Sequence, residues 1–133
     1  MFEDLILNEA QKLALVLAKM LGLKEHGKHS EFVQLAENTA LKEYDIAWDE
    51  LLDMPLVDFE AWLLNEGLST DKLDALAQLL YLQAEPLVAN AQTFLSLQKI
   101  LHTYNRLERE HRWQSLENIN RRKLIEQFMG DSL

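Results

Sequence analysis

The 133-residue sequence contains no cysteine, only two prolines and only four glycines. Without cysteine the chain forms no disulfide, no thiolate metal site and no cysteine nucleophile. The absence is typical of proteins in a reducing compartment, so we expect a cytoplasmic protein. The scarcity of proline and glycine leaves few positions for tight turns. The remaining composition is rich in leucine, alanine, glutamate, lysine and glutamine, which favour helices.

No segment alternates β-branched and polar residues with the period of two that a strand requires. We therefore predict an all-α fold, a single domain over residues 1–133 built as a bundle of six or seven antiparallel helices. We place these helices at residues 2–21, 32–40, 46–53, 57–66, 71–85, 87–110 and 116–129. The expected caps and stops are Gly22, Ser30, Asp45, Gly67, either Ser69 or Thr70, Ser115 and Gly130.

Long apolar runs are also lacking. The longest uncharged run of the first helix, LALVLA, is far shorter than the roughly 18 residues of a membrane span, and the N-terminus begins acidic. Residues 75–98 carry one charged side chain, Glu85, and we interpret them as a buried helical hairpin. We expect its core to contain Leu76, Leu79, Leu80, Phe94, Leu97 and Leu101.

Positive charge is scarce and unevenly placed. The formal net charge is −9 at pH 7, which opposes non-specific binding to nucleic acid or to an anionic membrane. Residues 1–98 hold 17 acidic and 6 basic side chains, whereas residues 99–133 hold 5 acidic and 7 basic ones. All five arginines lie between Tyr104 and Lys123. We therefore expect no membrane partner and no nucleic-acid partner.

The stretch LAQLLYLQAEPLVANAQTFLSLQKIL resembles a tetratricopeptide helix pair. Tyr81 occupies the aromatic position of the first helix, and Phe94 follows at the aromatic position of the second. Gln78 and Asn90 depart from the pattern, because they stand where the motif has small residues. The layout also resembles small bacterial all-helical proteins with a tetratricopeptide-like end. This resemblance implies a helical hairpin in the C-terminal half and implies no particular activity.

The arginine segment predicts a binding row. His102, Arg106, Arg109 and Trp113 are spaced by four, three and four residues, so they share one face if the helix continues through Trp113. Arginine and tryptophan are enriched at protein-binding hot spots. The alternative is a solvated face with Trp113 folded onto the core. Four pairs are predicted along the helices at a spacing of four residues, namely Arg106 with Glu110, Glu108 with Arg112, Glu117 with Arg121 and Arg122 with Glu126.

An acidic segment complements this row. Asp45, Asp49 and Asp53 are spaced by four residues and would form a repulsive column on one helix. We predict that Arg106 and Arg109 meet this column, either within one chain or, as we favour, in a two-fold dimer.

Two other classes of function remain as alternatives. Carboxylates on one helix can bind Mg²⁺, so the column could serve a metal-dependent enzyme acting on small molecules. The Tyr104–Lys123 segment could bind nucleic acid. The sequence has no Gly-x-Ser-x-Gly motif, no phosphate-binding glycine loop and no complete zinc ligand set. We therefore predict a non-catalytic protein–protein interaction module that binds a protein partner or itself, with no catalytic residue, cofactor or metal.

Overall fold

The computed structural model describes residues 8–132, and these residues form seven α-helices and no strand. The predicted all-α helical bundle is therefore confirmed. The helices are α1 (Glu9–Glu25), α2 (His29–Tyr44), α3 (Trp48–Asp53), α4 (Leu56–Glu66), α5 (Thr70–Ala84), α6 (Ala91–Glu110) and α7 (Leu116–Asp131).

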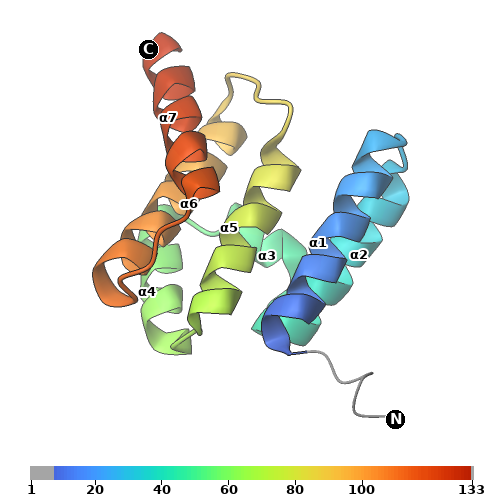
Figure 1. The fold of residues 1–133 in the computed structure, drawn as a ribbon. Helices are drawn as coiled ribbons and strands as arrows, with labels where there is room; N and C mark the ends of the chain where they lie inside the picture. The colour runs from blue at the N-terminus through green and yellow to red at the C-terminus, as the bar shows by residue number, and fades with distance from the viewer. Residues whose placement is uncertain (1–7, 133) are drawn as a thin grey trace.

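Helix α5 lies at the centre of the bundle and packs against both α1 and α6. Figure 1 shows α1 and α2 on one side of α5, and α6 and α7 on the other. The chain reverses direction from α5 to α6 and again from α6 to α7 (Figure 1), as the predicted succession of hairpins requires.

Several helix boundaries follow from local signals in the sequence. Ser69 and Ser115 precede α5 and α7, and their side chains accept hydrogen bonds from the backbone N–H groups three residues on, as predicted. Gly67 follows α4 with φ +58°, a left-handed conformation that glycine adopts without strain. The two serine caps pair backbone N–H groups that the start of a helix leaves free.

Other predicted boundaries are wrong. Helix α1 continues through Gly22 to Glu25, since packing of its neighbours offsets the cost of about 1 kcal/mol for an interior glycine. Helix α2 begins at His29, and Ser30 does not cap it. Helix α7 includes Gly130. The predicted first turns from Phe2 to residue 7 lie outside the described residues.

The connection between α5 and α6 is longer than predicted. Pro86, preceded by a cis peptide bond, belongs to this loop and begins no helix. Helix α6 starts at Ala91, after Asn90, whose side chain accepts a hydrogen bond from the backbone N–H of Thr93 at 2.8 Å. Asparagine is among the strongest N-cap residues, so this cap sets the boundary.

The core is centred on α5 and α6. The predicted residues Leu76, Leu79, Leu80 and Leu97 are at most 1% exposed. Phe94 and Leu101 are only partly buried, and Phe94 instead packs against the ring of Phe128 on α7, with ring centroids 5.9 Å apart. The core prediction is therefore right for the leucines of α5 and too broad for α6.

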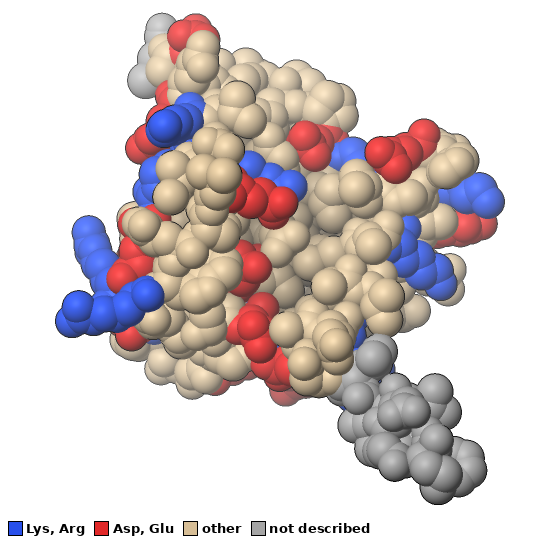
Figure 2. Space-filling view, viewed as in Figure 1, with Lys and Arg blue, Asp and Glu red and all other residues tan. Residues whose placement is uncertain are grey.

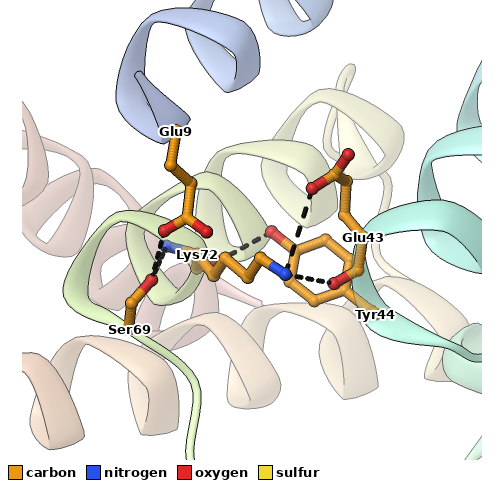
Figure 3. A network of polar contacts seen from close by, with 5 residues as sticks. All are labelled: Glu9, Glu43, Tyr44, Ser69 and Lys72. Carbon is orange, nitrogen blue, oxygen red and sulfur yellow. Dashed lines mark hydrogen bonds and ion pairs between the residues drawn. The ribbon is translucent and has the colours of Figure 1, made fainter.

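Polar contacts join the ends of α1, α2 and α5 (Figure 3). The Lys72 Nζ donates a hydrogen bond to the backbone carbonyl of Glu43 at 3.0 Å, near the C-terminus of α2. The Tyr44 hydroxyl donates to the carbonyl of Lys72 at 2.7 Å. Ser69 also donates to Glu9 Oε1 at 2.6 Å, which fixes the start of α1 beside the start of α5.

A second lysine likewise donates hydrogen bonds to backbone carbonyls near the end of a helix, here α3. Lys99 on α6 is fully buried, and its Nζ donates to the carbonyls of Leu51 and Leu52 at 2.8 and 2.9 Å. The ammonium group also lies 5.7 Å from the centroid of the Phe59 ring. Burial lowers the pKa of Lys99 to about 8, and the nearby carboxylate of Asp53 opposes that shift.

A third lysine, Lys24, donates to the carbonyls of Leu82 and Glu85 at the C-terminus of α5 and lies over the Phe32 ring. Cations are favourable at helix C-termini because the last carbonyls are unpaired and carry partial negative charge. Three helix ends in the bundle are thus held by lysines from other helices.

Two buried tyrosines provide a matched test of these contacts. Tyr44 and Tyr104 are 2% and 1% exposed. The hydroxyl of Tyr44 is hydrogen-bonded, whereas that of Tyr104 has no partner among the described residues. We expect Tyr44→Phe to lower the free energy of unfolding by about 0.5–1.5 kcal/mol and Tyr104→Phe to leave it unchanged or raise it. Urea unfolding of both variants measures the difference, and equal losses would contradict the assignment.

Candidate interaction surface

The predicted binding row is shorter in the structure than in the sequence pattern. His102, Arg106 and Arg109 lie on α6, which ends at Glu110. Arg112 then adopts a left-handed conformation with φ +53°, and this turn removes Trp113 from the row. The backbone N–H of Trp113 donates to the carbonyl of Leu107 at 3.0 Å, and its partly buried side chain packs against the core. The prediction that α6 continues through Trp113 is wrong.

Two members of the row already have partners. Arg106 Nη2 lies 2.6 Å from Glu110 Oε2, which confirms the predicted pair within α6. His102 Nδ1 lies 3.8 Å from Glu60 Oε1, and its ring meets the Phe59 ring edge-on. Burial lowers the pKa of His102, and the carboxylate of Glu60 opposes that shift. Arg109 is exposed.

The acidic column is divided between two elements. Asp45 ends α2 in a left-handed conformation with φ +52°, and Ala47 precedes α3 as its N-cap. Buried Ile46 anchors the turn between them. Asp49 and Asp53 alone share a helix, so the expectation of one column, and of Asp45 as the cap of α3, is wrong. All three aspartates are exposed. Within residues 8–132 no ion pair joins them to Arg106 or Arg109.

The arginines of α7 serve packing between helices. Arg121 pairs with Glu117 at 3.2 Å, as predicted, and its guanidinium lies 4.7 Å from the centroid of the Tyr81 ring. Arg122 pairs with Glu108 of α6 at 2.7 Å, so the predicted pairing of Arg122 with Glu126 is wrong. The predicted pair of Glu108 with Arg112 is also wrong, because α6 ends at Glu110, before Arg112. Each arginine thus attaches α7 to a neighbouring helix.

A groove of about 310 Å³ lies between α1, α5 and α7, and we call it the α1–α7 groove. Its α1 wall is entirely apolar and includes Ala10, Ala14, Leu17 and Leu21. The residues of α5 and α7 that line it include every polar side chain of the groove, namely Asp71, Asp74, Gln78, Glu117 and Arg121. One wall is therefore apolar and the opposite side is charged. A second groove, of about 610 Å³ between α1 and α2, is lined by two acids and two lysines, so its charges balance.

Asp74 is the least exposed acid of the α1–α7 groove. Its carboxylate accepts hydrogen bonds from Asn118 Nδ2 at 3.0 Å and from Gln78 Nε2 at 2.9 Å. Burial raises the pKa of Asp74, while the two amide donors lower it and the cation of Arg121 lowers it least. Among residues 8–132, the carboxylate is thus bonded to neutral donors and forms no ion pair with a cation.

None of the predicted site residues lines this groove, because the predicted rows rest on charged and aromatic side chains rather than on the apolar α1 wall. The relevant signal is the run LALVLA in α1, which is apolar on more faces than α2 and α5 can cover. Leu15 and Leu21 are accordingly 60% and 43% exposed.

The described part of the chain contains no group of three or more His, Asp or Glu side chains placed to hold a metal ion. Within residues 8–132, no helix is both long enough and apolar enough to cross a membrane. Comparison of the chain with protein-family models, curated proteins and solved structures finds no match. The resemblance of the α5–α6 hairpin to a tetratricopeptide pair stays a prediction.

Proposed function

We propose that the chain is a non-catalytic protein–protein interaction module that holds a partner in the α1–α7 groove. The observation that carries this proposal is the apolar α1 wall, which stands exposed beside a hollow. Exposed apolar surface next to polar residues is typical of interaction sites. The α5–α6 hairpin, with its tetratricopeptide-like sequence, supplies the floor through α5. The lack of cysteine favours a reducing compartment such as the cytoplasm.

The size of the apolar α1 wall determines how tightly a partner is expected to bind. Burial of an exposed leucine side chain contributes about 1.5–3 kcal/mol, whereas association costs at least about 4 kcal/mol in lost translation and rotation. The wall has three leucines, of which Leu13 is already buried, and three alanines, so it supports a reversible interaction rather than a permanent one.

Self-association is the second candidate. Arg106 is paired within its helix, so Arg109 would supply the cation, and Asp49 and Asp53 on α3 would supply the carboxylates. The exposure of all three side chains favours this candidate. Exposed ion pairs contribute only about 0–1 kcal/mol each, so the contact would select the partner more than it would hold it.

Site-specific photo-crosslinking in the native cell tests both candidates. A photoreactive residue is placed at Ala14 in the groove, at Arg109 on α6, or at Ala61 on the exposed surface of α4 as a control. We expect one discrete adduct from Ala14 and none from Ala61. An adduct of twice the chain mass from Arg109 alone would favour self-association instead. Equal labelling from Ala14 and Ala61 would refute the groove.

A further inference from the structure

We propose that the occupant of the α1–α7 groove is an amphipathic helix of a partner protein with lysine or arginine along one edge. This inference rests on the proposed function and names the partner's chemistry. The occupant would lay its apolar face on α1 and direct its basic edge toward α5 and α7.

The shape of the groove favours a helix. Ala10, Ala14, Leu17 and Leu21 are spaced by four, three and four residues, so they follow one face of α1. This face is about 16 Å long, at 1.5 Å per residue, and matches about three turns of a second helix. Helices in proteins pack against such faces at separations of about 8–10 Å.

The charges of the groove favour a basic edge. The lining contains three acids, Asp71, Asp74 and Glu117, and one base, Arg121. Arg121 is already engaged by Glu117 and by the Tyr81 ring, and its influence on Asp74 of α5 is weaker than that of the two amide donors. Figure 2 shows acidic side chains down the middle of this face, between the part formed by α7 and the part formed by α1.

Asp74 adds specificity to this charge. Its carboxylate is partly buried, and the two groups that donate hydrogen bonds to it are neutral amides. A lysine or arginine from the partner would give it the cation that it lacks, in a site partly shielded from water. Charge-assisted hydrogen bonds of this kind are roughly twice as strong as neutral ones.

A second copy of the chain is a poorer occupant. Each copy carries a formal net charge of −9, so two copies repel as one approaches the acidic side of the other's groove. The wall residues of α1 that a second copy would present include no basic side chain.

The test uses three synthetic amphipathic helices of about 18 residues, long enough to form helix on binding. All share the same leucine positions, and their polar positions are lysine, glutamine or glutamate. Fluorescence anisotropy measures binding to the full chain at low and moderate salt. We expect the Leu/Lys peptide to bind about tenfold more tightly than the Leu/Gln peptide, which corresponds to one or two partly shielded charge contacts. The Leu/Glu peptide should bind most weakly.

Matched variants separate the groove from general charge attraction. Ala14→Arg places a bulky cation on the α1 wall, and Ala61→Arg makes the same change on exposed α4. We expect Ala14→Arg to weaken Leu/Lys binding at least tenfold and Ala61→Arg to change it less than twofold. An equal effect of both variants would overturn the inference.

Two double variants test the acidic side chains of the groove. Asp71→Asn with Glu117→Gln removes two first-turn acids of the groove, and Asp58→Asn with Glu31→Gln removes two exposed first-turn acids elsewhere. Only the first pair should abolish the preference for Leu/Lys over Leu/Gln. If the Leu/Gln peptide binds as tightly as Leu/Lys and is still lost in Ala14→Arg, the basic partner is wrong but the docking groove stands. If no peptide responds to Ala14→Arg, the groove itself is refuted.

Discussion

Replacement of Lys99 by methionine is expected to lower the free energy of unfolding by about 1–3 kcal/mol. The substitution keeps the length of the side chain but removes the donor to the carbonyls of Leu51 and Leu52. The buried carbonyl of Leu51 then loses its donor from Lys99, and a buried carbonyl left without a partner costs about 1–3 kcal/mol. The carbonyl of Leu52 keeps a hydrogen bond from Gln92 Nε2 at 3.3 Å. Removal of the buried charge of Lys99 offsets part of this loss of stability. Urea unfolding measures the net effect.

Lys24→Met is the matched control, because Lys24 also donates to two carbonyls at a helix end but is partly exposed. Water can replace its hydrogen bonds, so we expect a loss below about 1 kcal/mol. If both variants lose the same amount, burial is not what makes Lys99 important.

The pH dependence of the free energy of unfolding shows whether Lys99 loses its proton more readily in the folded chain than in the unfolded chain. Its pKa is lowered to about 8 in the folded chain, against an ordinary value of 10.5. Between these values the unfolded state binds the proton and the folded state does not, so the free energy of unfolding rises with pH. Lys99→Met lacks this contribution, and its deficit relative to the wild type should therefore widen from pH 8 to pH 10. Burial raises the pKa of Tyr44 and Tyr104, so ionisation of these tyrosines in the unfolded state lowers the free energy of unfolding at higher pH. This contribution is the same in the wild type and in Lys99→Met, so it cancels from the difference between them. A constant deficit would show that Lys99 titrates alike in both states.

The sequence was most informative where the determining contacts are local. Ser69 and Ser115 cap residues three positions away, and Arg106 and Arg121 pair with acids four positions away. Such contacts require only helical periodicity, which the composition already predicts. The fold class and the order of the helices follow from the same signals.

Contacts between distant residues could not be predicted in this way. Lys99 reaches carbonyls 47 and 48 positions earlier in the chain, and nothing in the local sequence distinguishes it from an exposed lysine. The break between Asp45 and Asp49 depends on burial of Ile46 by other helices. The α1–α7 groove likewise depends on where α7 comes to lie beside α5, and the residues of α1 do not encode that separation.

The loss of the Phe59 side chain should have the largest effect on stability, about 3–5 kcal/mol for Phe59→Ala. The ring is fully buried on α4 and packs against Trp62, with ring centroids 5.9 Å apart. It also lies under the Lys99 ammonium group and meets His102 edge-on. The cavity would therefore remove apolar contacts and admit water beside two titratable groups.

Phe94→Ala is the control, because Phe94 is only partly buried and its ring packs against that of Phe128 on α7. We expect its loss of stability to be about half as large, since the cost of truncation follows the volume of the cavity that remains.

In Phe59→Ala, hydration of the His102 ring should also raise the pKa of His102 toward its ordinary value, because burial is what lowers it. Nuclear magnetic resonance titration of the imidazole measures this shift, which Phe94→Ala should not produce. An unchanged pKa of His102 in Phe59→Ala would mean that the Phe59 ring does not shield the imidazole from water. Packing of Phe59 on α4 would then have no effect on the protonation of His102 on α6.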